Sequence, residues 1–214
     1  MGSLLAKALG VDHATPYAFK FSGLTLWLLA ADPAVQRVID DFNPNCPRWR
    51  AHSTLAYGLG LDEAAARGRF ARLKDAVAGT GAVSFASSGP QFFGDYPPYR
   101  MRVVGLPLEP DDGSYAALRR ALRDHFDTDG SGHPHASLVY DWIGSPRVTP
   151  DVADAIRRAA PALRAGAALR FDEVALVDMR DATVGEWTIL DRVSLAAAGC
   201  DSSAAGGDPS APSA

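Results

Sequence analysis

The feature that most constrains this chain is an order of predicted elements that occurs twice. From Asp32, and again from Asp111, the sequence predicts a helix, a strand that contains a histidine, a second helix and two further strands. The two histidines, His52 and His135, stand 83 residues apart, which is the length of one half. A duplicated unit of this kind predicts an α+β fold with two lobes. Two antiparallel sheets would face each other across a central cleft, with the helices on the outside.

Local signals place the elements along the chain. A nearly continuous apolar run over residues 23–30 predicts a buried strand before the first helix. Asp32, Asp62 and Thr149 each precede a predicted helix, where their side-chain oxygens can accept hydrogen bonds from free backbone amides. Residues 82–106 predict two strands on either side of a connection rich in Pro and Tyr.

One domain is expected over residues 23–195, since 214 residues of which 47% are hydrophobic can form a single core shared by two lobes. Residues 1–22 are only weakly specified. Residues 196–214 are small, polar and rich in Gly and Pro. Such a tail cannot bury enough apolar area to offset the entropy of ordering it, so we expect it to be disordered.

Composition excludes several classes of protein. The net charge of −4 provides no basic face for long nucleic acid, although it allows a small nucleotide in a local pocket. Cys46 and Cys200 form no CxxC pair, so we expect no zinc site and no disulfide framework, and a reducing, cytoplasmic location fits. No apolar run is long enough to span a membrane, and the first residues contain no long apolar signal region. We expect a monomer.

Both histidines belong to the pattern His-x-(Thr/Ser)-Leu-x-Tyr. Residues two apart on a strand share a face, so His52 lies beside Thr54, and His135 beside Ser137, while the leucines face the core. One neutral imidazole can take a proton from water, one imidazolium can protonate a leaving oxygen, and the hydroxyls can bind phosphoryl oxygens. The pattern therefore predicts phosphoester chemistry without metal or cofactor. A lone His-x-Thr pair is usually only a tolerated polar pair, but its repetition favours catalysis.

The segments HSTL and HASL resemble the paired motifs of the two-histidine (2H) phosphoesterase superfamily. Within that superfamily, the chain most resembles the plant and fungal cyclic phosphodiesterases over about residues 24–195. The stretches that carry this narrower resemblance are LTLWLLA, FNPNCPRWRAHSTLAY, HPHASLVYDW and LRFDEVALVDMRDATVGEWTILDRVSL. Ala51 departs from the family, which often has Pro before the first histidine, and residues 94–100 look rearranged.

The resemblance implies a bilobal 2H phosphoesterase fold and hydrolysis of cyclic phosphates. The substrates would be ADP-ribose 1″,2″-cyclic phosphate, from a route linked to tRNA splicing, and nucleoside 2′,3′-cyclic phosphates. The products would be ADP-ribose 1″-phosphate and nucleoside 2′-phosphates. By analogy, His135 would activate water and His52 would protonate the leaving oxygen, although the symmetry of the sequence leaves these roles interchangeable.

Two other functions remain as alternatives. An RNA-end 2′,3′-cyclic phosphodiesterase of the same superfamily would need a basic track, which the negative net charge disfavours. A nucleotide-binding module without catalysis predicts the loss of a motif histidine or hydroxyl, and all four are present.

Several further residues are candidates for substrate binding. Tyr140 matches a family tyrosine near the phosphate. Strict alternation would turn it away from Ser137, and a β-bulge would turn it back. Tyr57 holds the equivalent place in the first half and has a weaker claim.

Nucleotide contacts are expected from aromatic and basic side chains near the cleft. Trp27, with Phe92 or Phe93, could stack on a base, and core packing is the alternative, favoured for Phe93. Arg48 and Arg50 precede His52 at intervals of two and could meet a diphosphate, with solvated strand-end charges as the alternative.

Overall fold

The computed structural model describes residues 21–43, 46, 49–96, 101–130, 132–143, 145, 148–183 and 186–196. Almost all of the predicted tail, and most of the weakly specified N-terminal segment, lie outside these residues. The elements in chain order are β1 (Leu24–Ala30), α2 (Pro33–Phe42), β2 (His52–Ala56), α3 (Glu63–Val77), β3 (Val83–Ser87), β4 (Gln91–Tyr96), β5 (Met101–Pro110), α4 (Ser114–Phe126), β6 (His135–Trp142), α5 (Pro150–Ala159), the short 3₁₀ helix η2 (Pro161–Leu163), β7 (Ala168–Asp178) and β8 (Thr188–Ser194).

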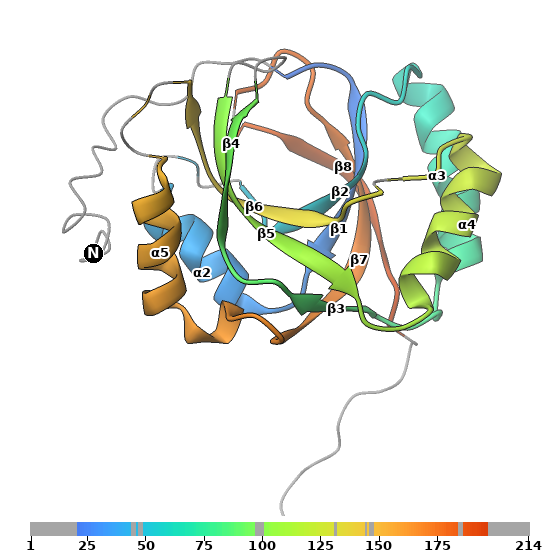
Figure 1. Cartoon of the computed structure of the whole chain (residues 1–214). Helices are drawn as coiled ribbons and strands as arrows, with labels where there is room; N and C mark the ends of the chain where they lie inside the picture. The colour runs from blue at the N-terminus through green and yellow to red at the C-terminus, as the bar shows by residue number, and fades with distance from the viewer. Residues whose placement is uncertain are drawn as a thin grey trace, which may run out of the picture.

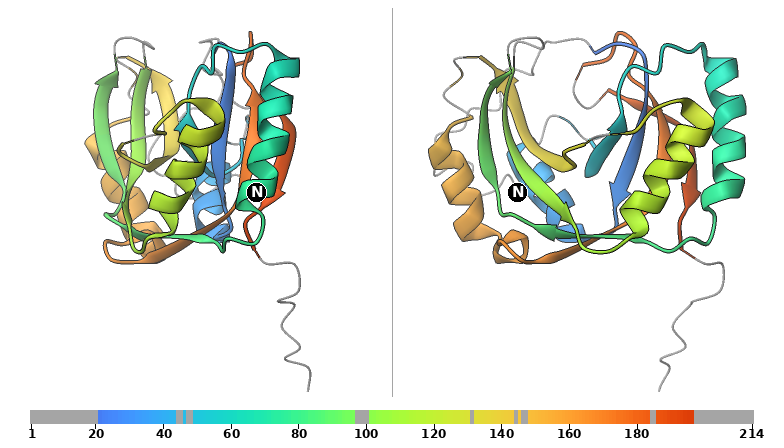
Figure 2. Two further views of the ribbon diagram at one scale, coloured as in Figure 1. Left: turned by 90° about the vertical axis from the view of Figure 1, so that its right-hand side faces the viewer. Right: turned by 45° about the vertical axis from the view of Figure 1, so that its right-hand side comes forward.

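The eight described strands belong to one antiparallel sheet that curves back on itself as two facing walls (Figures 1 and 2). Their order is β1-β2-β6-β5-β3-β7-β8, with β4 paired to β5 and an additional pairing of β1 with β7. The walls join where β3 pairs with both β5 and β7, and where Ser53 of β2 pairs with Ala136 of β6. The predicted α+β class is confirmed, and hydrogen bonds link its two facing sheets into one.

The helices cover the outer surfaces of these walls. Helices α3 and α4 pack side by side on the wall that contains β7 and β8, and α2 and α5 pack on the wall of β4, β5 and β6 (Figure 1). Each of these helices buries apolar residues at intervals of three and four, which places them on one face. For α4 these residues are Tyr115, Leu118, Leu122 and Phe126. None of the helices in the described residues is both long and apolar enough to cross a membrane.

The predicted helix starts are confirmed. Asp32, Asp62 and Thr149 accept hydrogen bonds from amides in the first turns of α2, α3 and α5, at 2.8, 2.7 and 3.4 Å. These caps satisfy donors that a helix leaves free at its N-terminus, so local sequence defines where each helix begins.

The prediction of two strands over residues 82–106 is wrong, because the structure has three. The chain turns between β3 and β4 at Gly89, whose φ of 81° is unfavourable for other residues, and the amide of Gly89 donates to Ser87 Oγ at 2.9 Å. Strand β3 then pairs with one end of β5 and β4 with the other. The repeated unit therefore begins one strand earlier than predicted, at β1 and at β5.

Candidate active site

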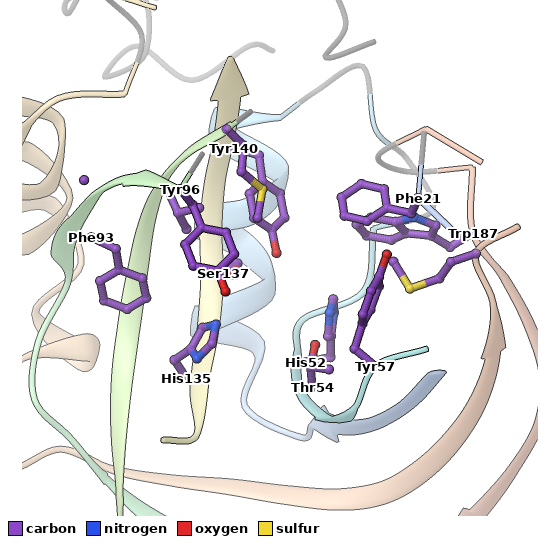
Figure 3. A pocket seen from close by; sticks show the side chains of 14 residues that line it. Phe21, His52, Thr54, Tyr57, Phe93, Tyr96, His135, Ser137, Tyr140 and Trp187 are labelled. Carbon is purple, nitrogen blue, oxygen red and sulfur yellow. The ribbon is translucent and has the colours of Figure 1, made fainter. Parts of the chain in front are cut away.

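The four motif residues meet in one cavity between the walls. His52 and Thr54 on β2, and His135 and Ser137 on β6, all line a space of about 480 Å³ (Figure 3). The antiparallel pairing of Ser53 with Ala136 brings the two motifs side by side, so that both polar pairs face the same gap. The fold thus brings together, in one cavity, the motif residues predicted in the two halves of the sequence.

Six of the other ten residues that line this cavity are aromatic. Strands of both walls and the chain on either side of them contribute Phe21, Tyr57, Phe93, Tyr96, Tyr140 and Trp187. Sequence reasoning did not assign Phe21, Tyr96 or Trp187 to the site. Phe21 and Trp187 pack against each other with ring centroids 5.4 Å apart. Phe21, two residues before the predicted start of the domain, belongs to the core.

Backbone carbonyls fix the tautomer of both imidazoles. His52 Nδ1 lies 2.6 Å from the carbonyl oxygen of Arg50, and His135 Nδ1 lies 3.1 Å from that of His133. A carbonyl can only accept, so Nδ1 carries the hydrogen in each ring. Nε2 is then the nitrogen left for proton transfer in both histidines.

The two imidazoles differ in their surroundings. His52 is 5% exposed, and burial lowers its pKa from 6.5 to about 4, opposed by its hydrogen bond to the Arg50 carbonyl and assisted by the nearby His135. His135 is only half-buried. His52 is therefore neutral near pH 7 and able to accept a proton.

A β-bulge in each half explains why the motif continues with Leu and then Tyr. On β2, Thr54 pairs with Trp27 and Ala56 pairs with Leu26, which leaves Leu55 as an extra residue. A bulge shifts the alternation by one position. Tyr57, three residues after the motif hydroxyl, therefore returns to the cavity face.

The second half contains an equivalent β-bulge. On β6, Ser137 pairs with Gly105 and Val139 pairs with Val104, so Leu138 is the extra residue. Tyr140 consequently lines the cavity, as a bulge was expected to allow. Its ring stacks on Trp49 with centroids 4.8 Å apart. Burial raises the pKa of Tyr140 to about 12, partly offset by a hydrogen bond with Ser137, so its hydroxyl remains protonated beside that of Ser137.

Asn43, which sequence reasoning missed, supports the second bulge. Its Nδ2 donates to the carbonyl oxygens of Ile39 and Leu138, each at 2.8 Å. The extra residue of a bulge is left outside the regular strand pairing. Asn43 therefore caps the end of α2 and satisfies the carbonyl of Leu138 in the bulge with one amide group. Its position directly after a predicted helix was the available signal.

Replacing Asn43 by alanine should lower the free energy of unfolding by about 1–3 kcal/mol, because two buried carbonyls lose a donor. Urea denaturation measures this change. Asn43→Asp is the matched variant, since it keeps the size of the side chain but replaces its donor with an acceptor. It should destabilise the protein at least as much as Asn43→Ala, and unchanged stability in both variants would contradict this role.

The expectation that Trp27 stacks on a base is wrong. Trp27 is 1% exposed, and its ring lies parallel to the imidazole of His52 with centroids 3.7 Å apart. It pairs with Thr54 on the neighbouring strand, which places it diagonally against His52 on the same face. Trp187 packs edge-on against both rings. Trp27 supports His52 and presents no free face to a ligand.

Trp27→Ala should therefore act mainly on stability. Removing a fully buried indole should cost about 3–5 kcal/mol of unfolding free energy, measured in urea. Phe93→Ala is the comparison, because Phe93 is 41% exposed and its removal should cost far less. Equal losses in the two variants would show that Trp27 does not hold the core.

The expectation for Phe92 is also corrected. Phe92 is partly buried against the core and is not among the residues that line the cavity, and the guanidinium of Arg102 lies 5.8 Å from its ring centroid. Phe93, for which core packing was favoured, lines the cavity instead. The register of β4 shifts between Phe92 and Gly94, and this bulge re-aims the intervening side chain.

The predicted contact through the Arg50 side chain is not supported. Arg50 is exposed and is not among the residues that line the cavity, and the site uses its backbone carbonyl instead. Arg48 lies outside the described residues.

A two-walled antiparallel sheet, with an imidazole and a hydroxyl from each of two matching strands in one cavity, defines the site of a two-histidine phosphoesterase. A comparison with protein families matches residues 15–183 to the 2′-5′ RNA ligase superfamily. The chain belongs to this superfamily of 2H phosphoesterases, which indicates phosphoesterase or phosphodiesterase activity. A search of curated proteins found no match.

Solved structures are similar to this chain at low sequence identity. The protein TT0787 of Thermus thermophilus is 17% identical, with a TM-score of 0.51 over 82% of this chain and 98% of its own. A protein described as a phosphoesterase is 18% identical, with a TM-score of 0.50 over 82% and 99%. LigT of E. coli complexed with 3′-AMP is 20% identical, with a TM-score of 0.48 over 84% and 99%.

Proposed function

We propose that this chain hydrolyses small cyclic phosphates. It would open nucleoside 2′,3′-cyclic phosphates to nucleoside 2′-phosphates, and ADP-ribose 1″,2″-cyclic phosphate to ADP-ribose 1″-phosphate. The observation that carries the proposal is the convergence of His52 and His135, each with a hydroxyl two residues further on, in one cavity. The resemblance of the sequence to the plant and fungal cyclic phosphodiesterases supports the narrower choice of substrate.

The chemistry needs one base and one acid. Neutral His52 takes a proton from water through Nε2 while the water oxygen forms a bond to phosphorus. His135, in its protonated form, gives its proton to the ring oxygen as the phosphorus–oxygen bond breaks. The cycle ends with His52 protonated and His135 neutral, and exchange with solvent restores both. The lowered pKa of His52 favours these roles over the reverse assignment that the resemblance suggested.

Thr54 and Ser137 complete the site by donating hydrogen bonds to the non-bridging phosphoryl oxygens. Tyr140 holds the hydroxyl of Ser137 in place through their hydrogen bond. This arrangement stabilises the additional negative charge that develops on those oxygens when water attacks.

The pH dependence of kcat/KM follows from His52. His52 must be neutral in the free protein to act as a base, and its pKa is about 4, so kcat/KM should fall as pH drops through about 4. An ordinary histidine would produce this fall near 6.5. A profile of kcat/KM on adenosine 2′,3′-cyclic phosphate measures the position of the acid limb, and a limb at the ordinary value would refute the proposed state of His52.

One assay tests the proposed reaction. The protein is incubated with adenosine 2′,3′-cyclic phosphate and EDTA, and the product is identified by chromatography against both monophosphates. Adenosine 2′-phosphate is expected. Adenosine 3′-phosphate would contradict the choice of bond, inhibition by EDTA would contradict metal independence, and absence of turnover would overturn the proposal. Faster turnover of an oligonucleotide ending in a cyclic phosphate would favour the RNA-end alternative.

A further inference from the structure

The two catalytic histidines have different aromatic neighbours, although the halves that carry them correspond. In the first half, Trp27 of β1 pairs with Thr54, and its indole covers His52. In the second half, the residue that pairs with Ser137 is Gly105 of β5. The position that supplies an indole in one half therefore supplies no side chain in the other.

Phe93 of β4 occupies the space above Gly105. A Cβ added to Gly105 would lie 2.3 Å from Cε2 and 2.6 Å from Cζ of Phe93, so any side chain at position 105 would displace this ring. The ring of Phe93 contacts His135 edge-on, with centroids 5.4 Å apart and an interplanar angle of 83°. Because Gly105 has no side chain, the ring of Phe93 from the neighbouring strand can pack over it and contact His135.

Exposure separates the two aromatic neighbours. Trp27 is 1% exposed, whereas Phe93 is 41% exposed and lines the cavity beside His135 (Figure 3). An exposed aromatic ring in a cavity offers a surface on which a nucleobase can stack, because every base has a flat π-face.

We propose that Phe93, seated on Gly105, is the residue that stacks on the base of the substrate and selects a base attached to the same ribose as the cyclic phosphate. This inference rests on the proposed function. Phe93 lies directly beside His135, so it reaches a group only one sugar away from the phosphorus. In ADP-ribose 1″,2″-cyclic phosphate, a diphosphate and a second ribose separate the base from that position. Nucleoside 2′,3′-cyclic phosphates are therefore the preferred class.

The test compares Phe93→Ala with Phe92→Ala, its neighbour outside the cavity. The substrates are adenosine 2′,3′-cyclic phosphate and methyl riboside 2,3-cyclic phosphate, which lacks a base. Phe93→Ala should raise KM for the adenosine substrate by about 5- to 150-fold, the effect of losing one base–aromatic stack, with little change in kcat. KM for the base-free substrate should stay the same, and Phe92→Ala should change neither value.

Two further variants and a binding measurement complete the test. Gly105→Ala should raise KM for the adenosine substrate, because the added methyl group displaces Phe93. Phe93→Trp, made in the otherwise unchanged protein, should keep KM low, since an indole can also stack on the base. The dissociation constant of adenosine 2′-monophosphate, measured by calorimetry, should rise with Phe93→Ala whether or not the protein turns over substrate. An unchanged dissociation constant, or equal effects on both substrates, would overturn the stacking role. Failure of the wild-type protein on every cyclic phosphate would instead refute the proposed function.

Discussion

Replacing His52 or His135 by alanine is expected to lower kcat on adenosine 2′,3′-cyclic phosphate by about 10²–10⁴-fold, the usual contribution of a positioned acid or base. The two side chains line one cavity, and both keep Nε2 free because Nδ1 is bound to a backbone carbonyl. Each variant therefore removes one of the two proton transfers. Steady-state kinetics gives the effect, and urea denaturation shows whether the fold persists.

The nature of the leaving group separates the two roles. A p-nitrophenyl phosphodiester releases a stable anion and needs little help from an acid. His135→Ala should therefore lose much less activity on this substrate than on the cyclic phosphate, whereas His52→Ala should lose as much on both. The opposite pattern would assign the base to His135, and near-normal turnover of cyclic nucleotide in either variant would defeat the mechanism.

Removing a motif hydroxyl is expected to lower kcat by about 10²–10³-fold, as the loss of one donor to a developing oxyanion does. Thr54→Val and Ser137→Ala are the relevant variants, because valine keeps the shape of threonine and alanine fits the site of serine. The hydroxyls bind charge that grows as water attacks, so kcat should fall more than KM rises.

Ser53 provides the matched control for these variants. It lies between His52 and Thr54 but points to the opposite face, where it is fully buried, and its Oγ has no hydrogen-bond partner. Ser53→Ala should leave kcat unchanged and stability unchanged or higher, since an unsatisfied hydroxyl costs free energy when buried. A loss of kcat as large as that in Ser137→Ala would show that serine removal acts through the strand.

The motif residues were predictable because they depend on a short and regular pattern. A period of two on a strand places a histidine and the hydroxyl two residues later on the same face. The repetition of that pattern in two matching halves implied a shared cleft. The helix starts at Asp32, Asp62 and Thr149 were equally local, since a cap depends only on residues of the first turn.

The errors arise where the strand period is interrupted or where distant segments meet. Bulges at Leu55, Leu138 and Phe93 each change which side chains face the cavity, and a bulge leaves little trace in sequence. Phe92 and Phe93 were therefore assigned to the wrong sides.

Burial is a further quantity that a single sequence does not contain. From the sequence, Trp27 was expected to stack on a base. In the structure β1 lies between β2 and β7, and the indole of Trp27 is buried against His52. The same enclosure lowers the pKa of His52. Burial therefore differs between His52 and His135, although the two motifs are nearly identical in sequence. The proposed acid and base roles therefore depend on tertiary packing.

The most direct measurement is a crystal structure of the protein with adenosine 2′-monophosphate bound. The account predicts that Nε2 of His52 and Nε2 of His135 both lie within about 2.6–3.2 Å of oxygen atoms on the same phosphorus. A phosphate that contacts only one imidazole, or that binds outside the cavity between the two walls, would contradict it.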